Sequence, residues 1–567
     1  AAVRAADTTA AAVAEERRYP ARSNRGPRQD KDFEYGYHMS IAKASEQYGD
    51  AATREAVDRE VMQMLDLGVW ETVDPKTLSS EEFRAVIYSL LFLKAKFDPG
   101  GLFEKLKGRL VANGSQQDRT KYVNLSSPGV KQQSVFIGAG IAAMEKRFVV
   151  TLDIVGAYLK VNMKSTQVRV RLQPHVAARV VEQRPQLKRF LLRDGSLIVL
   201  LKKAMYGCVE SARLLFEEVR GALVDDGFEQ NPYDECIFNK VVDGVQCTVL
   251  LYVDDMMITC CNEAAIESVV KCVKRKFGTV QVHRGKVHNY LGMKFDFSKP
   301  KECVVTMAGY MADLMKLFSV QGAATTPAAN HLFHIREGIG VLDKKMREAF
   351  HSAVAKILYL AKRIRPDLLL AVSFLATRVT APDEDDWAKL QRLLKYINGT
   401  QSLGLVLKFD DSMEITGFVD ASYAVHGSDM RSHTGGCISL GGGVFTARST
   451  KQKIVTKSST EAELVGASDY AGDLLEQRAI VEAQGYEIGP ARLGQDNMST
   501  ITLINNGRAS SGHTRHINIR FFWLKDKVDN GELVVSHVPT EEMVADILTK
   551  PLQGEQFKKL RKMLLGM

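Results

Sequence analysis

Two adjacent carboxylates, Asp254 and Asp255, stand between two short runs of core residues in the segment "TVLLYVDDMMIT", residues 248–259. The runs are rich in β-branched and apolar residues, which predicts two strands joined by a tight hairpin. Like charges held together at a hairpin tip raise each other's pKa unless a cation neutralises them, so the pair fits a divalent metal ion. The alternative is an ordinary exposed turn, because Asp also favours turns.

A third carboxylate, Asp153, ends the apolar strand that we predict in "RFVVTLDIVGAYL", residues 147–159. An acidic residue at the end of a buried strand is unusual. If this strand and the hairpin are neighbours in one sheet, the three carboxylates converge and can hold two Mg²⁺ ions about 4 Å apart. The pattern therefore predicts phosphoryl transfer, in which an attacking hydroxyl is activated and a leaving pyrophosphate is stabilised.

A second set of carboxylates follows a fresh alternation of strands and helices that starts near residue 415. We expect Asp420 to end a strand, Glu461 to begin a helix, Asp496 to follow the run "ARLGQDN" and Asp546 to lie on a final helix. Both Ser458–Glu461 and Thr460–Glu463 have the spacing of a capping box at the start of that helix. Each carboxylate taken alone is more simply a helix cap or a surface charge.

Composition limits the class of protein. By length, 567 residues correspond to roughly three to four domains. The longest apolar runs, such as residues 368–376, are far shorter than the roughly twenty residues of a membrane span, so no membrane partner is expected. Eight cysteines without a CxxC pair predict reduced intracellular thiols. A net charge of +9 has the sign expected for a partner of phosphate backbones.

The N-terminal quarter combines basic and helical patterns. Residues 1 to about 45 read as a disordered basic tail, with six basic residues and one acidic residue between Arg17 and Lys31, and the initial Ala suggests a fragment or a processed product. A helix is predicted over residues 51–67. Two strands are predicted around the turn at residues 98–101, and the basic residues along them are Lys94, Lys96, Lys105, Lys107 and Arg109. The strands are either a basic clamp for phosphates or an ordinary antiparallel pair with one face toward solvent.

Several collinear motifs resemble the reverse transcriptase of copia-type LTR retrotransposons. The metal-site segments "TLDIVGAYL" and "LYVDD" carry the likeness first. It extends over roughly residues 50 to 550 through "LGVWETVDP" (67–75), "KLKGRLVANG" (105–114), "LKKAMYGCVESAR" (201–213), "YLGMKFDF" (290–297), "RIRPDLLLAV" (363–372) and "LLKYINGTQSLGL" (393–405). The order of these motifs makes the resemblance more specific than any one of them.

The resemblance implies a role for each matched residue. It makes Asp153 and Asp254 the principal metal ligands and Asp255 the supporting carboxylate. It places the nucleotide and nucleic-acid contacts at Lys107, Arg109, Tyr158 and Arg213. Tyr158 would lie under the incoming sugar and exclude a 2′-hydroxyl, with packing in the palm core as the alternative.

The second set of carboxylates resembles a ribonuclease H domain. This resemblance implies that Asp420, Glu461, Asp496 and Asp546 hold two Mg²⁺ ions and that a water attacks an RNA phosphodiester in line. Selectivity for RNA would come from the 2′-hydroxyl and the shape of the hybrid. The segment "HTRHINIRFFWL", residues 513–524, matches a further copia motif, in which His516 is a candidate substrate contact.

Together these resemblances imply an α+β polymerase right hand of fingers, palm and thumb, followed by an α/β ribonuclease H-like domain. The expected division is a disordered basic tail (1–45), fingers and palm (46–300), a mostly helical thumb or connection (301–410), a ribonuclease H-like domain (411–552) and a basic C-terminal tail (553–567). The expected function is an RNA-directed DNA polymerase with ribonuclease H activity, with two Mg²⁺ ions per site and Mn²⁺ as a substitute.

The implied partners are an RNA template, a DNA primer, an RNA–DNA hybrid and deoxynucleoside triphosphates, with the capsid and integrase products of the same element as further candidates. The implied location is intracellular, in a cytoplasmic particle, with the nucleus as an alternative. The chain departs from the family pattern at Glu210 and Ala212, where the family has an amide and a proline. A catalytically decayed or co-opted nucleic-acid-binding remnant is therefore the competing hypothesis.

Overall fold

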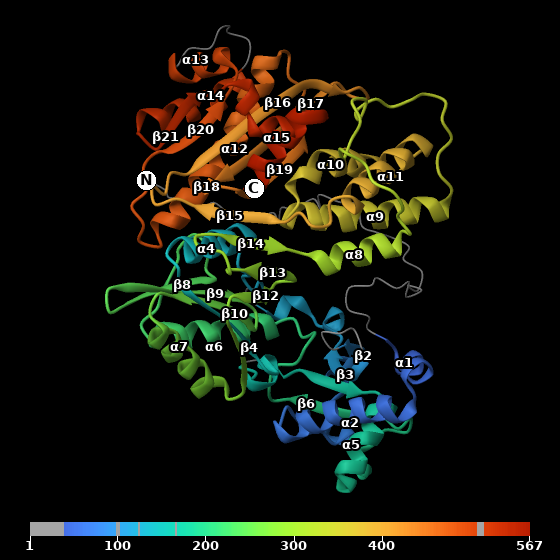
Figure 1. The fold of residues 1–567 in the computed structure, drawn as a ribbon. Helices are drawn as coiled ribbons and strands as arrows, with labels where there is room; N and C mark the ends of the chain where they lie inside the picture. The colour runs from blue at the N-terminus through green and yellow to red at the C-terminus, as the bar shows by residue number, and fades with distance from the viewer. Residues whose placement is uncertain (1–38, 98–102, 123–124, 165–166, 507–514) are drawn as a thin grey trace, which may run out of the picture. The chain divides into compact units, whose positions relative to one another are not determined.

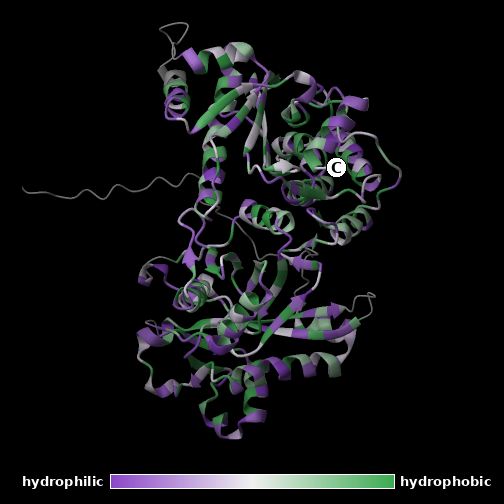
Figure 2. Cartoon of the chain, turned by 60° about the vertical axis from the view of Figure 1, so that its left-hand side comes forward, coloured by the Kyte–Doolittle hydropathy of each residue, from purple (hydrophilic) through white to green (hydrophobic). Residues whose placement is uncertain are grey.

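The computed structural model describes residues 39–97, 103–122, 125–164, 167–506 and 515–567 (Figure 1). The chain forms two compact units, one of residues 1–118 and 164–208 and the other of residues 119–163 and 209–567. Figure 2 shows hydrophobic and hydrophilic residues on the helices of the chain. Most of the basic tail expected at residues 1–45 lies outside the described residues, but helix α1 (Ile41–Tyr48) already begins within it.

The first unit is built on a five-stranded sheet, here called sheet A. Its order is β1 (Trp70–Thr72), β6 (Leu197–Leu201), β5 (Arg169–Leu172), β2 (Ile87–Phe97) and β3 (Phe103–Ala112). The predicted helix is α2 (Asp50–Asp66), which packs on β3. The expected basic hairpin is the β2–β3 pair, in which Lys94 lies opposite Lys107 and Lys96 lies opposite Lys105.

The second unit contains a six-stranded antiparallel sheet, sheet B. Its order is β11 (Val280–Arg284), β4 (Phe148–Ile154), β10 (Asp255–Cys260), β9 (Val245–Tyr252), β8 (Ile237–Val242) and β7 (Glu229–Gln230). Helices α4 (Gln132–Met144) and α7 (Glu263–Phe277) pack on its central strands, and α6 (Ser211–Asp225) packs on α7. Most residues of strands β9 and β10 are buried on both faces, which explains their nearly continuous apolar sequence.

A mostly helical region follows, as expected for residues 301–410. It contains α8 (Ala308–Leu317), α9 (Lys344–Arg363), α10 (Leu369–Arg378) and α11 (Glu384–Asn398). A five-stranded sheet C joins this region to its neighbours, in the order β12 (Val287–Tyr290), β13 (Met293–Asp296), β14 (Cys303–Thr306), β15 (Leu405–Phe409) and β18 (Gly441–Gly442). Segments from before and after the helices thus share one sheet.

The last sheet, sheet D, is mixed. Its order is β19 (Val444–Lys451), β17 (Arg431–Ser439), β16 (Thr416–His426), β20 (Ala491–Gln495) and β21 (Leu533–His537), with β16, β20 and β21 parallel. Helix α12 (Ser459–Glu482) packs on β16 and β17, and α13 (Met498–Asn506) and α14 (Arg515–Asp529) follow β20. Strand β16 continues six residues past Asp420, so this carboxylate lies within the strand and not at its end, as the sequence had suggested.

The C-terminal residues 553–567 are not a tail. They form helix α15 (Gly554–Leu565), whose apolar side chains Phe557, Leu560 and Leu564 are buried. The Phe557 ring meets the ring of Tyr396 edge to face at 5.8 Å. The basic residues that suggested a tail occupy the other side of this amphipathic helix.

A buried ion pair anchors the helical region. The Arg365 guanidinium donates to both carboxylate oxygens of Asp367 at 2.9 and 2.8 Å, and both side chains are fully buried. The Tyr396 hydroxyl donates to Asp367 at 2.7 Å, and Arg561 of α15 donates to Tyr396 at 3.1 Å. The network therefore connects the "RIRPDL" segment, α11 and α15.

Removing one partner of this pair should be strongly destabilising. Arg365→Met leaves the Asp367 carboxylate buried without its cation, which is expected to cost about 3–5 kcal/mol of unfolding free energy. Urea unfolding followed by circular dichroism measures the loss. The matched control is Lys558→Met, which removes the exposed Lys558–Glu555 pair and should change stability by less than about 0.5 kcal/mol. Equal stability of the Arg365 variant and the parent would contradict this role.

Candidate active sites

The three acidic residues predicted from the hairpin and its neighbour lie at adjacent backbone positions on sheet B. Strand β10 lies between β4 and β9, and Asp255 is paired directly with Asp153 of β4. Asp254 occupies the turn between β9 and β10, and its carbonyl accepts from the backbone N–H of Ile154 at 3.1 Å. Two strands and one turn therefore place Asp153, Asp254 and Asp255 near one another along the backbone. Their joint role as metal ligands stays a prediction.

The turn that carries Asp254 has only two residues outside the strand pairing. Asp255 pairs with Tyr252, so Val253 and Asp254 form the loop. Val253 has φ of +60°, a conformation that a β-branched residue adopts at a cost of roughly 1–3 kcal/mol. The surrounding strands hold this tight turn in place, and it fixes Asp254 beside the end of β4.

One carboxyl group of this cluster has a raised pKa. Burial, together with the nearby carboxylates of Asp254 and Asp153, raises the pKa of Asp255 to about 6. Such a shift is expected where like charges share a site that a cation would neutralise. Carboxylate oxygens are the ligands that Mg²⁺ and Mn²⁺ prefer, so the chemistry of this donor set fits a divalent ion.

A second carboxylate cluster lies on sheet D. The parallel pairing places Phe418 of β16 opposite Gly494 of β20. Asp420 comes two residues after Phe418 and Asp496 two residues after Gly494, so both lie at the same edge of the sheet. Asp546 joins them from the short 3₁₀ helix η8 (Val544–Leu548), where the sequence had suggested a longer final helix. One carboxylate oxygen from each of Asp420, Asp496 and Asp546 lies within 4.8 Å of the others.

The expected fourth member of this cluster, Glu461, points elsewhere. Its carboxylate accepts from the backbone N–H of Lys457 at 2.7 Å, and its own N–H donates to Ser458, the N-cap of α12. Glu463 of the same helix is the glutamate whose pKa responds to the Asp420 charge. The Glu463 side chain is buried and accepts from Gln495 at 3.2 Å, and burial together with the Asp420 charge raises its pKa to about 9.

Two groups that the sequence argument missed also touch this cluster. The Thr549 hydroxyl donates to Asp420, and the Lys550 ammonium lies 2.7 Å from Asp546 and 3.3 Å from Asp420. Burial and the Asp420 charge raise the pKa of Asp546 to about 6 in spite of this lysine. Their position three and four residues after Asp546 is the only sequence signal that could have identified them.

The candidate nucleic-acid contacts lie on several elements. Lys107 and Arg109 are on one face of the β2–β3 hairpin, and the Arg109 guanidinium stacks 4.3 Å from the ring centre of Tyr206. Arg213 lies in the first turn of α6 and forms an ion pair with Glu217 at 2.8 Å. Tyr158 is half-buried in the 3₁₀ helix η4 (Ala157–Lys160), four residues after the end of β4. His516 is in α14, but its side chain lies outside the described residues.

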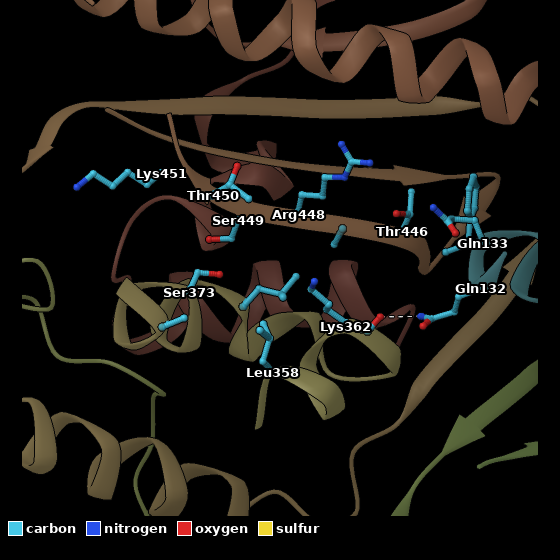
Figure 3. A pocket seen from close by; sticks show the side chains of 14 residues that line it. Gln132, Gln133, Leu358, Lys362, Ser373, Thr446, Arg448, Ser449, Thr450 and Lys451 are labelled. Atoms are coloured by element: carbon cyan, nitrogen blue, oxygen red, sulfur yellow. Dashed lines mark hydrogen bonds between the residues drawn. The ribbon is translucent and has the colours of Figure 1, made fainter. Parts of the chain in front are cut away.

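A cavity of about 620 Å³ opens along the edge strand β19, opposite helices α9 and α10 (Figure 3). Its wall includes Gln132 of α4, whose amide donates to the carbonyl of Lys362 at 2.6 Å. The lining residues include none of the carboxylates of either cluster. This cavity is therefore distinct from both candidate metal sites.

Comparison with known proteins identifies the part of the chain that contains the first cluster. Residues 91–329 match the family described as "Reverse transcriptase (RNA-dependent DNA polymerase)". This range contains β4, β9 and β10 with Asp153, Asp254 and Asp255. Residues 91–329 are therefore similar to reverse transcriptases. The first cluster lies within this matched range, and the second lies outside it.

The relatives confirm the resemblance to copia-type Pol polyproteins. The chain is 26% identical over 539 residues to "Retrovirus-related Pol polyprotein from transposon RE2" of Arabidopsis thaliana, covering 93% of this chain and 35% of that protein. It is 25% identical over 491 residues to the corresponding protein from transposon TNT 1-94 of Nicotiana tabacum, covering 84% of this chain and 35% of that protein. The chain therefore spans about a third of the length of these relatives.

A solved structure supports the reverse transcriptase fold. The chain aligns with a foamy viral protease-reverse transcriptase, described as in complex with ds DNA, with a TM-score of 0.50 and 11% sequence identity. The alignment covers 86% of this chain and 70% of the other. None of the helices in the described part of the chain has the length and apolar character required to cross a membrane.

Proposed function

We propose that the chain is an RNA-directed DNA polymerase that also cleaves the RNA strand of an RNA–DNA hybrid. The observation that carries the polymerase half is the pairing of Asp153 with Asp255 beside the Asp254 turn, within the range that is similar to reverse transcriptases. The observation that supports the nuclease half is the convergence of Asp420, Asp496 and Asp546 on a mixed sheet. Each half has its own metal-binding carboxylates.

In the polymerase site, the roles follow from position. Asp153 and Asp254 would hold two divalent ions, with Asp255 as the supporting carboxylate on the same strand pair. Divalent ions at such a site activate the primer hydroxyl and stabilise the leaving pyrophosphate. Lys107 and Arg109 would contact the triphosphate or template, Arg213 and His516 would contact nucleic acid, and Tyr158 would exclude a ribose 2′-hydroxyl.

In the nuclease site, Asp420, Glu463, Asp496 and Asp546 would hold the metal ions. Glu463 takes the role that the sequence assigned to Glu461, because it is the glutamate of α12 that is close to Asp420. Divalent ions at such a site supply a nucleophilic hydroxide and stabilise charge on the phosphate. The protein's contribution is a rigid carboxylate cage on β16, β20, α12 and η8.

The proposed substrates are a primed RNA template, deoxynucleoside triphosphates and the resulting hybrid. The basic face of the β2–β3 hairpin and the net charge of +9 are consistent with a phosphate-rich partner. The ds DNA described for the foamy viral structure also favours a duplex partner here. Capsid and integrase products of the same element remain proposed partners, and a cytoplasmic particle or the nucleus remains the proposed location.

The departure at Glu210 does not remove the metal-binding groups. Glu210 is buried at the N-cap of α6, where the partial positive charge of the helix terminus favours a carboxylate.

The proposal is tested with purified protein and Mg²⁺ on an RNA template annealed to a labelled DNA primer. Extension that requires deoxynucleotides is expected, together with cleavage of the template RNA within the new hybrid. Mn²⁺ in place of Mg²⁺ is the second condition. Absence of both reactions under both metals, with folded protein, would favour the non-catalytic remnant.

Metal binding at the polymerase site should depend on pH because of Asp255. Its raised pKa means that the carboxyl is largely protonated below about pH 6 and must lose its proton before it can bind a metal ion. Mn²⁺ affinity at this site is therefore expected to rise by about ten-fold per pH unit between pH 5 and 6 and then to level off. Calorimetric titrations of the parent and of Asp255→Asn isolate this contribution. A pH-independent difference between the two proteins would contradict it.

A further inference from the structure

The cluster on sheet D already contains one cation, the Lys550 ammonium. Its Nζ lies 2.7 Å from Oδ1 of Asp546 and 3.3 Å from Oδ1 of Asp420. Both aspartate side chains are at least 95% buried, and their oxygens belong to the trio that lies within 4.8 Å. The lysine therefore contacts two of the three carboxylates that a divalent ion would require.

The chain around Lys550 fixes where this ammonium can reach. The backbone N–H groups of Thr549 and Lys550 both donate to the carbonyl of Asp546, at 3.1 and 2.8 Å. The Thr549 hydroxyl donates to Asp420. The backbone of Lys550 is thus tied to the cluster, while 37% of its side chain is exposed, so the ammonium has an open path into solvent.

The charges of the cluster favour a resident cation. Burial together with the Asp420 charge raises the pKa of both Glu463 and Asp496, as expected where negative charge gathers around Asp420. Burial opposes a charge on Lys550, but the carboxylates of Asp420 and Asp546 raise its pKa above its ordinary value. An ammonium so placed relieves repulsion among buried carboxylates that would otherwise disfavour the folded site.

We propose that Lys550 is a tethered counter-ion that competes with the divalent metal for Asp420 and Asp546. Bound to these carboxylates, it holds the cage assembled between metal-binding events. Entry of a metal displaces the ammonium toward solvent, so the lysine sets the metal concentration at which the site fills. This inference deepens the proposed nuclease function and rests on it, and Lys550 acts as a positioning residue.

The test uses the full chain and Mn²⁺ titrations. Lys550→Met removes the competing charge and keeps most of the side-chain volume, so the Mn²⁺ binding that depends on Asp546 should become about ten-fold tighter. Asp546→Asn, alone and combined with Lys550→Met, shows which part of the total Mn²⁺ binding belongs to the sheet D cluster and which part to the sheet B cluster. Lys550→Arg keeps the charge and should bind Mn²⁺ like the parent, and the exposed Lys558→Met is the matched control.

A second measurement needs no substitution. Amine-reactive labelling of the parent, mapped by mass spectrometry, should modify Lys550 at least about three-fold faster with saturating Mn²⁺ than with EDTA. The displaced side chain is no longer held by the carboxylates, which stabilise its protonated, unreactive form. The labelling of Lys558 should not change. This measurement covers the case in which the Lys550→Met variant does not fold.

The possible results distinguish a failure of the counter-ion role of Lys550 from a failure of the nuclease activity. Unchanged or weaker Mn²⁺ binding in Lys550→Met, or labelling of Lys550 that is indifferent to Mn²⁺, would overturn the counter-ion role. Absence of any Asp546-dependent Mn²⁺ binding would overturn it as well. A parent that shows the expected competition but does not cleave a hybrid would support the counter-ion role and reject the nuclease activity.

Discussion

Replacing Asp254 by Asn is expected to reduce primer extension by at least about a thousand-fold, equivalent to about 4 kcal/mol of transition-state stabilisation. The amide keeps the size of the side chain and removes the charge that would bind the metal ions. Because Asp254 lies in the two-residue turn between β9 and β10, the substitution should leave the sheet intact. The measurement is single-turnover extension of a DNA primer on an RNA template.

Two comparisons make this result specific. Asp255→Asn is expected to retain more extension than Asp254→Asn, since Asp255 is the supporting carboxylate. Hybrid cleavage should stay within about three-fold of the parent in both variants, because sheet D carries its own carboxylates. Extension by Asp254→Asn at the rate of the parent would show that the Asp254 carboxylate is not a metal ligand of the polymerase reaction.

Replacing Glu463 by Gln is expected to reduce hybrid cleavage by at least about a hundred-fold, because it removes a carboxylate beside Asp420. The amide also preserves the side-chain volume in a buried position. Primer extension should be unaffected. The measurement is the rate at which the RNA strand of a preformed, labelled hybrid is cut.

Glu461 offers a matched control two residues away on the same helix. Glu461→Gln loses a charge at the first turn of α12, and its expected cost is about 0.5–1 kcal/mol of stability with cleavage within about three-fold of the parent. The reverse pattern, with cleavage lost in Glu461→Gln and kept in Glu463→Gln, would restore the assignment made from the sequence.

The polymerase carboxylates could be located from the sequence because their positions depend on local geometry. An Asp pair between two core strands predicts a hairpin, in which Asp254 occupies the turn and Asp255 the first position of the next strand. The pairing of β4 with β10 required only that two apolar strands be neighbours in one sheet. The structure contains this pairing, so Asp153 lies opposite Asp255 and beside the turn that carries Asp254.

The choice between Glu461 and Glu463 could not be made in the same way. Residues two apart on a helix point about 200° apart, so only one of the two can face Asp420. Both glutamates have a Ser or Thr three residues earlier, and the sequence alone does not say which pair caps α12. The structure uses Ser458, which commits Glu461 to the helix terminus and leaves Glu463 facing the sheet.

Longer-range features were also beyond the sequence. The sequence of helix α15 is basic, and its apolar side is recognised as a packing surface only from its contact with Tyr396. Lys550 reads as one of many surface lysines until η8 places Asp546 beside Asp420. In each case the deciding contact joins segments more than a hundred residues apart, which no local pattern encodes.

The most direct test of two separate active sites is one reaction that reports both activities. The substrate is an RNA template labelled at one end and annealed to a DNA primer carrying a second label, incubated with Mg²⁺ and deoxynucleotides. The parent is expected to extend the primer and cut the template, Asp254→Asn to cut only, and Glu463→Gln to extend only. Loss of both activities in either folded variant, or neither activity in the folded parent, would contradict the account.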